Sequence, residues 1–110
     1  AGHTAGVDRL RRLLDGSDLW QPGAARRLQD PISFRTLAPV AGHALRAVAA
    51  VRQTVDAELA SVPDSPAVLV ERDILLSSVN FDTTELALTF EAAGLALSHL
   101  AATSAARIVK

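Results

Sequence analysis

Two long stretches of the sequence place apolar side chains at helical spacing. In residues 36–61 the larger apolar side chains follow one wide stripe, and alanines occupy much of the remaining surface. In residues 84–109 apolar side chains cover more than one face. This periodicity predicts two long helices, and their small side chains allow close approach of neighbouring helices. We expect Pro39 in the first turn of the first helix, because proline has no amide hydrogen to donate.

Shorter patterns fill the rest of the chain. Residues 4–15 repeat apolar side chains as a short amphipathic helix does, and Gly16 is suited to end it. Residues 16–34 are interrupted by glycine and proline, so we expect an irregular connector there, with Trp20 packing it onto a helix. Residues 62–83 are predicted to form turns and loops, with a minor β-hairpin within 67–76.

These elements predict an all-α fold, in which residues 1–110 form a single helical segment. Its main feature is a long antiparallel helical hairpin, preceded by the short N-terminal helix. The second long helix is so apolar that a chain of 110 residues has too little mass to bury it. We therefore expect the chain to belong to something larger, an oligomer or a longer polypeptide.

The composition excludes several classes of function. The chain is 49% hydrophobic and carries a net charge of −1, which predicts a folded protein without affinity for nucleic acid or anionic membranes. It has no cysteine, and its three histidines lie far apart, so no metal site is predicted. The longest uninterrupted apolar stretch falls short of the roughly 18 residues that span a bilayer. With no recognisable signal peptide, a soluble cytoplasmic protein is expected.

Polar residues gather before the first long helix, in Gln29-Asp30-Pro31-Ile32-Ser33-Phe34-Arg35, and again at Asn80-Phe81. With their flanks, they resemble motifs of the aromatic amino acid ammonia-lyase family, which includes histidine, phenylalanine and tyrosine ammonia-lyases and aminomutases. The family patterns are Q-D-x-Y-S-x-R-C-x-P-Q-V-x-G, E-x-N-S-V-x-D-N-P-L-V, G-G-N-F and H-P-G-Q. They correspond to residues 29–42, 58–68, 78–81 and 3–6, with Gln29, Asp30, Ser33, Arg35, Val40 and Gly42 matching in the first.

The resemblance implies a fragment of a much longer enzyme. Members of the family are largely helical homotetramers, with a central bundle of long helices and active sites built from more than one subunit. They eliminate ammonia from an aromatic amino acid to give an arylacrylate. Their electrophile is a methylidene-imidazolone formed from an internal Ala-Ser-Gly, which does not occur in this chain. The chain also contains no tyrosine, so the family's N-terminal catalytic tyrosine is missing. The chain alone is therefore expected to be inactive.

Four residues correspond to substrate-binding positions of the family. Arg35 matches the arginine that pairs with the substrate carboxylate, for which a planar guanidinium is suited. Gln29 matches a glutamine near the electrophile and substrate, Phe81 an aromatic beside them, and Asn80 its supporting neighbour. Each also has a structural interpretation. Arg35 would pair with Asp30 or cap a turn, Gln29 and Asn80 would bond to loops, and Phe81 would join a core.

Some positions depart from the family patterns. The tyrosine of Q-D-x-Y is Ile32, which cannot donate a hydrogen bond or move a proton. Ser65 replaces the asparagine of D-N-P, and Ser78-Val79 replaces the two glycines of G-G-N-F. Asp82 stands where many relatives have histidine or glutamine, and a role in substrate choice is one interpretation.

These departures leave the function of the larger protein open. It would be a lyase, an aminomutase or an inactive relative. Two alternatives are not enzymes. One is a non-catalytic helical self-association module, and the other is a helical bundle that binds a small ligand in a closed pocket.

Overall fold

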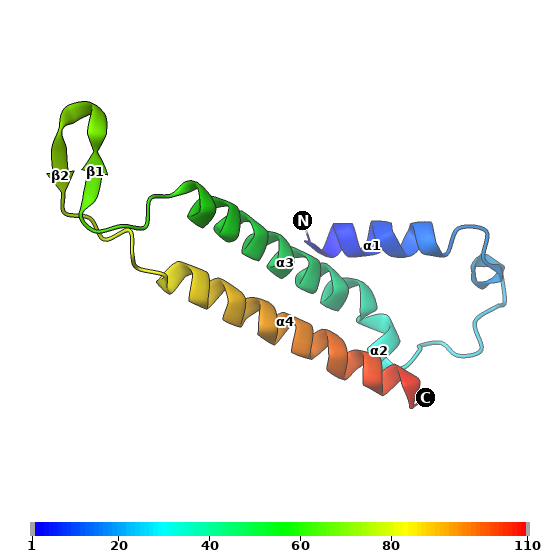
Figure 1. Ribbon diagram of the computed structural model, residues 1–110. Coiled ribbons are helices and arrows are strands. Elements are labelled where there is room, and N and C mark those ends of the chain that lie inside the picture. The colour runs from blue at the N-terminus through cyan, green and yellow to red at the C-terminus, as the bar shows by residue number, and fades with distance from the viewer. Residues whose placement is uncertain (1, 110) are drawn as a thin grey trace. The chain divides into compact units, whose positions relative to one another are not determined.

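The computed structural model describes residues 2–109, and its helices account for most of them. The all-α prediction is confirmed, and the minor hairpin lies within the range expected for it (Figure 1). In chain order the elements are α1 (Gly2–Leu13), the 3₁₀ helix η1 (Asp18–Trp20), α2 (Ile32–Arg35), α3 (Leu37–Ala60), β1 (Ala67–Leu69), the 3₁₀ helix η2 (Val70–Arg72), β2 (Ile74–Leu76) and α4 (Thr84–Ile108).

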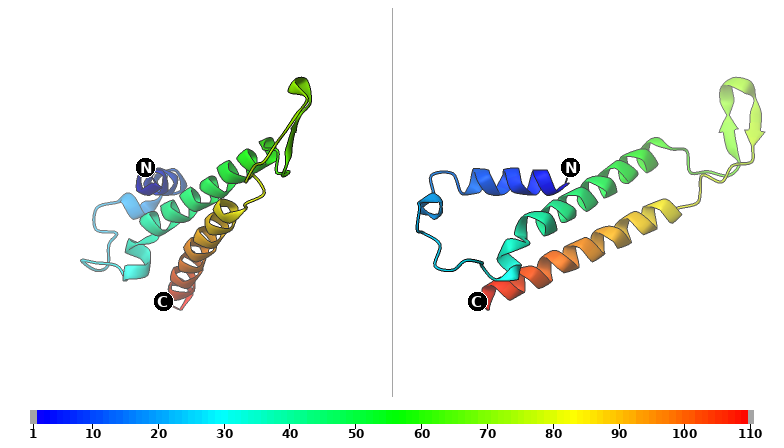
Figure 2. Two further views of the ribbon diagram at one scale, coloured as in Figure 1. Left: turned by 90° about the vertical axis from the view of Figure 1, so that its left-hand side faces the viewer. Right: turned by 180° about the vertical axis from the view of Figure 1, so that it is seen from behind.

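The chain divides into two compact units, to which both long helices contribute. Unit 1 comprises Ala1–Arg46 and Gly94–Lys110, and unit 2 comprises Ala47–Ala93. Within each unit, a stretch of α3 lies antiparallel to a stretch of α4 (Figures 1 and 2). The predicted sites therefore fall on two units, each of which is described by itself.

In unit 1, helix α1 lies against the first turns of α3. Gly6 and Gly42 are both buried at this contact. A Cβ at Gly6 would collide with the carbonyl oxygen of Ala38 and lie 3.2 Å from the backbone nitrogen of Gly42. Backbones therefore approach each other directly here, which only glycine permits at position 6.

The end of α1 is tied to the connector by the chain's tryptophan. Trp20 Nε1 donates a hydrogen bond to the carbonyl oxygen of Leu14 at 2.7 Å, although the ring is largely exposed. Gly16 turns the chain with a φ of +72°, a value that glycine adopts without strain. The indole thus holds η1 beside the last turn of α1.

Helix α2 occupies the end of the segment expected to be an irregular connector, and this is a difference from the prediction. Pro31 immediately precedes α2, where its missing amide hydrogen costs nothing. Its carbonyl oxygen accepts hydrogen bonds from the amides of Phe34 and Arg35, at 2.9 and 3.3 Å. Thr36, with φ −90° and ψ 4°, separates α2 from α3, which then begins at Leu37 with Pro39 in its first turn.

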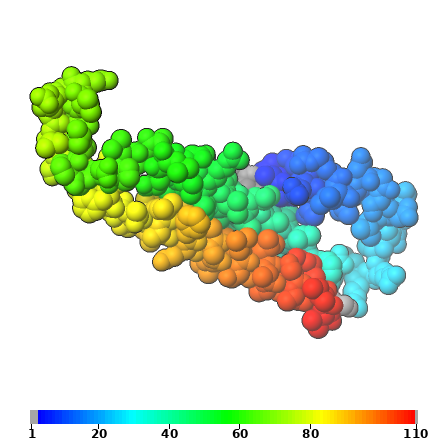
Figure 3. All heavy atoms as spheres, viewed as in Figure 1, coloured from blue at the N-terminus to red at the C-terminus, as the bar shows by residue number. Residues whose placement is uncertain are grey.

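In unit 2, stretches of α3 and α4 are linked by Thr54 and Thr89, whose hydroxyl oxygens lie 3.4 Å apart. The hairpin pairs β1 and β2 antiparallel, from Ala67 opposite Leu76 to Leu69 opposite Ile74. Asp73 completes the turn in the left-handed region. The hairpin projects away from the helices of its own unit, as the three views of Figures 1 and 2 agree (see also Figure 3).

Few side chains are buried within the chain. Among the described residues, the buried hydrophobic side chains are Ala44 and Ala93, while many leucines, valines and phenylalanines are exposed. Helix α4 is long and apolar enough to cross a membrane by length and composition alone, and only 6% of its most apolar window is buried. Core helices of soluble proteins pass the same test. The apolar surface of α4 therefore exceeds what the described chain covers.

Candidate functional site

The first part of the candidate site is the α2 corner, which we define as Gln29, Pro31 and α2. Arg35 Nη1 donates a hydrogen bond to Gln29 Oε1 at 2.9 Å, on the exposed surface of unit 1. The structure thus brings together two of the four residues that the sequence indicated. In the described part of the chain, the ion pair present is Arg52–Asp56, so Arg35 bonds to Gln29 rather than to Asp30.

The α2 corner is attached to α4 by an arginine that the sequence motifs did not indicate. Ser33, within α2, is buried, and its carbonyl oxygen accepts a hydrogen bond from Arg107 Nη1 at 2.8 Å. Arg107 Nη2 also donates to Ser104 Oγ at 2.8 Å. Figure 2 shows α2 beside the C-terminal end of α4. The available signal was an arginine in the last turn of an alanine- and leucine-rich helix, where a partly buried guanidinium needs partners.

The position of the family tyrosine presents an apolar side chain. Ile32 is the first residue of α2, and its side chain is 67% exposed. Its carbonyl oxygen accepts a hydrogen bond from Thr36 Oγ1 at 2.8 Å. The backbone of Ile32 therefore helps to end α2, while its side chain supplies no polar group to the corner.

The other two indicated residues belong to unit 2, in what we call the paired loops, residues 61–66 and 77–83. Asn80 Nδ2 donates to the carbonyl oxygen of Val62 at 3.3 Å, so it joins one loop to the other. The neighbouring Phe81 is 61% exposed and contributes no buried core. Within the described chain, Asn80 therefore joins the two loops, and Phe81 lies exposed.

Two of the departures from the family patterns meet in the paired loops. Ser65 Oγ donates to the carbonyl oxygen of Ser78 at 2.9 Å, and Ser78 Oγ donates to the carbonyl oxygen of Asp64 at 3.0 Å. Each hydroxyl thus bonds to the backbone of the opposite loop. Short side chains with a hydroxyl are well suited to such side chain to backbone bonds.

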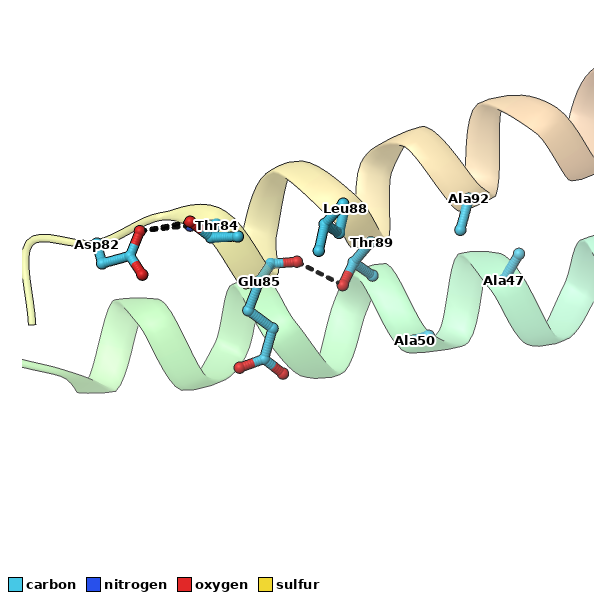
Figure 4. Close-up of a pocket in the computed structure, with 8 residues that line it drawn as sticks. All are labelled: Ala47, Ala50, Asp82, Thr84, Glu85, Leu88, Thr89 and Ala92. Carbon is cyan, nitrogen blue, oxygen red and sulfur yellow. Dashed lines mark hydrogen bonds between the residues drawn. The ribbon is translucent and has the colours of Figure 1, made fainter.

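An open groove of about 590 Å³ lies at the start of α4 in unit 2 (Figure 4). Its floor is made of small or apolar side chains, and Asp82 and Glu85 lie at one end; the lining is Ala47, Ala50, Asp82, Thr84, Glu85, Leu88, Thr89 and Ala92. The groove is too open to enclose a small molecule in the way that a deep ligand pocket does. The closed single-chain pocket required by a ligand-binding bundle is therefore absent at this place.

Asp82 is engaged with the start of α4. Its Oδ1 accepts hydrogen bonds from the hydroxyl of Thr84 at 2.6 Å and from the amide of Thr84 at 3.1 Å. The hydroxyl bond first, and the amide bond second, lower the pKa of Asp82 below its usual value. The side-chain acceptor at the start of α4 is therefore Asp82, whose negative charge favours a helix N-terminus.

The hydrogen-bonded pair of Arg35 and Gln29 has the chemistry to recognise an anionic ligand. A guanidinium and a carboxamide that share a hydrogen bond both offer N–H donors to a carboxylate ligand, without any change of charge. Among residues 2–109, no three histidine, cysteine, aspartate or glutamate side chains cluster as metal ligands. Since the sequence has no Ala-Ser-Gly, its residues do not fit the formation of a methylidene-imidazolone.

Comparison with known proteins gives one consistent result. The family model described as aromatic amino acid lyase matches residues 1–110. A histidine ammonia-lyase of Geobacillus thermodenitrificans is 36% identical over 102 residues, covering 93% of this chain and 20% of the relative. A histidine ammonia-lyase of Bradyrhizobium diazoefficiens is 37% identical over 110 residues, covering 98% of this chain and 21% of the relative. The chain therefore spans about a fifth of the length of these relatives.

A solved structure is similar as well. The crystal structure of the ergothioneine-degrading enzyme ergothionase from Treponema denticola superposes with a TM-score of 0.90 at 35% sequence identity. The match covers 99% of this chain and 22% of the ergothionase chain.

Proposed function

Because the chain belongs to the aromatic amino acid lyase family, we propose that it supplies part of the substrate site of an ammonia-lyase-like enzyme. The reaction is the elimination of ammonia from an aromatic amino acid to give an arylacrylate. Within it, Arg35 binds the substrate carboxylate and Gln29 orients Arg35. Phe81 lies beside the substrate ring, with Asn80 supporting the loop that carries it.

The hydrogen bond between Arg35 and Gln29 is the observation that carries this proposal. The bond fixes the direction of the Arg35 guanidinium on the exposed surface, which supports a preformed pair of recognition groups. A carboxylate is the ligand whose geometry best matches a guanidinium, because two parallel hydrogen bonds form at once. Preordering of Arg35 reduces the side-chain entropy lost when substrate binds.

The electrophile of the reaction would come from a segment other than these residues. In the family, a methylidene-imidazolone activates the amino acid for elimination, and this chain has no Ala-Ser-Gly from which to form it. We accordingly assign binding and orientation to this chain, and no covalent step. The exposed apolar faces of its helices support burial against further segments and copies in a cytoplasmic homo-oligomer, a tetramer by analogy with the family.

The proposal is tested first at the level of the gene. The reading frame upstream of Ala1 is expected to encode an Ala-Ser-Gly, and its absence from the complete gene product would favour the non-catalytic self-association module instead. Exposed leucines on α4 are the observation that supports this second candidate.

The second test is enzymatic. The 110-residue chain is incubated with histidine, phenylalanine or tyrosine, and the absorbance of the arylacrylate is followed. We expect no turnover by this chain and turnover of at least one substrate by the full-length gene product. Ergothioneine, which the similar enzyme from Treponema denticola degrades, is assayed beside them. Turnover by the 110-residue chain would refute the assignment of a binding role alone.

If the full-length product rearranges the amino group instead of releasing ammonia, it is an aminomutase, and the binding role of Arg35 is unchanged. If it binds the amino acid without converting it, it is an inactive relative. Product analysis by mass spectrometry separates these outcomes.

A further inference from the structure

We propose that Arg107 is a positioning residue for the α2 corner, which it holds in place for binding of the substrate carboxylate. This inference rests on the proposed function of Arg35. Arg107 does not itself touch the substrate in this proposal; it acts through the backbone of Ser33.

The geometry at Arg107 carries the inference. Its Nη1 donates at 2.8 Å to the carbonyl oxygen of Ser33, a residue 74 positions away and two residues before Arg35. Its Nη2 donates at 2.8 Å to Ser104 Oγ, one turn earlier on α4. The side chain is half-buried, and Ser33 is buried. The charged guanidinium of Arg107 and the buried carbonyl oxygen of Ser33 are therefore hydrogen-bonded to each other.

Helix α2 needs such an attachment, because it is only four residues long. A helix of that length is unstable by itself, since nucleation fixes several residues for very few hydrogen bonds. Arg35 stands at its last position, so any fraying of α2 displaces the guanidinium that would meet the substrate. Helix α4, with 25 residues, is the more rigid element, and Arg107 links the corner to it.

Arginine is the side chain required by this arrangement. In its planar guanidinium group, Nη1 donates to Ser33 and Nη2 donates to Ser104. The bond to Ser104 therefore fixes the direction of the bond to Ser33. A lysine at the same place would have a single nitrogen and would reach one partner well. If Arg107 only stabilised the end of α4, its bond to Ser104 and its favourable charge near the helix C-terminus would suffice. The bond to Ser33 is the part that such a role does not need.

The experiment uses the full-length gene product with the substitutions Arg107→Gln and Arg107→Lys. Hydrogen exchange is measured by mass spectrometry on peptides covering residues 31–36, with peptides of the hairpin as the internal reference. Loss of a hydrogen bond from a charged group is expected to speed exchange in residues 31–36 by about tenfold, with partial recovery in the lysine variant. The matched control is Arg52→Gln, an exposed arginine of α3 that pairs within its own helix.

Steady-state kinetics supply the second measurement. Arg107→Gln is expected to raise KM for the amino acid by about tenfold, with a smaller change in kcat, because misplacement of Arg35 weakens substrate binding. Arg35→Gln is measured in parallel. If Arg35→Gln leaves KM unchanged while Arg107→Gln speeds exchange at residues 31–36, the proposed function fails and the attachment of α2 stands.

Two results would overturn the inference. One is unchanged exchange of residues 31–36 in Arg107→Gln, equal to that in the Arg52→Gln control. The other is an unchanged KM in Arg107→Gln when Arg35→Gln raises it. Should Arg107→Gln not fold, Ser104→Ala replaces it, since that variant keeps the arginine and removes the hydroxyl that directs it, together with the bond of that hydroxyl to the carbonyl oxygen of Leu100. A smaller acceleration of exchange, about threefold, is then expected, and none would refute the inference.

Discussion

The α2 corner and the paired loops both carry family motifs, yet they are held together in different ways. The corner is bonded to α4 by one charged side chain, Arg107, which donates to a carbonyl oxygen 74 positions away. The paired loops depend on three neutral hydrogen bonds between residues 13 to 18 positions apart. A charged hydrogen bond to a buried group is stronger than a neutral exposed one.

The two regions also differ in how they accommodate departures from the family patterns. Ser65 and Ser78 replace an asparagine and a glycine, and they bond to each other's loops. Ile32 replaces a tyrosine and gains no partner for its side chain, which is 67% exposed. In the loops the replacing hydroxyls form hydrogen bonds, whereas at the corner the replacing side chain supplies no polar group. Changes of chemistry are expected at the corner.

The largest effect is expected at Arg35. In the full-length gene product, Arg35→Gln should lower kcat/KM by about 100-fold, because two charge-assisted hydrogen bonds to a carboxylate are lost. Arg35→Lys keeps the charge without the planar fork and should recover part of this loss. Initial rates of arylacrylate formation measure both. A similar loss in Ser65→Ala would contradict the functional contrast between corner and loops.

The next effect is expected at Ile32. The substitution is made in the full-length gene product. If a tyrosine at this position transfers a proton, Ile32→Tyr should raise kcat for an aromatic amino acid by about tenfold or more. Ile32→Phe adds the ring without the hydroxyl and is the matched control. The two variants are compared by kcat and by its pH profile. Equal rates in both would mean that the hydroxyl has no part in the reaction.

A smaller effect is expected in the paired loops. Ser65→Ala and Ser78→Ala each remove one neutral hydrogen bond, and each should destabilise the loops by about 1 kcal/mol. Exchange of peptides covering residues 61–66 and 77–83 should therefore accelerate about fivefold, while residues 31–36 remain unchanged. Ser98→Ala is the control, because that hydroxyl bonds within its own helix. Acceleration confined to one loop would show that the loops are not paired in solution.

The smallest effect is expected at the exposed Asp82. Its pKa is lowered by hydrogen bonds from Thr84, so the charged form is favoured in the folded chain. The stabilisation is present above the ordinary aspartate pKa and is lost as the pH falls through the lowered value. Thr84→Val removes the hydroxyl donor and should raise the pKa of Asp82 toward its usual value, as measured by NMR titration. Thr103→Val is the control, since its hydroxyl bonds within α4.

Two residues of the candidate site could be predicted, because they lie at fixed places within one contiguous sequence motif. Gln29 and Arg35 were identified from their places in a linear pattern, and their hydrogen bond spans only six positions. The short helix α2 was not predicted, because Pro31 and the glycines before it suggested an irregular segment. The sequence around Pro31 is compatible both with a proline just before a helix and with a proline in a loop. The backbone hydrogen bonds of residues 31–36 show that a helical turn is present, and the bond from Arg107 to Ser33 joins it to α4.

The sequence by itself determined the all-α class, the hairpin within residues 67–76, the family and the absence of Ala-Ser-Gly and tyrosine. These are local properties: helical periodicity repeats every 3.6 residues, and motifs are contiguous. Only the tertiary structure decided that Arg107 holds the α2 corner, that Ser65 and Ser78 bond across the paired loops, and that Gly6 meets Ala38. Each joins residues far apart in the sequence. Such pairs are selected by how the chain folds back on itself, which no local pattern records.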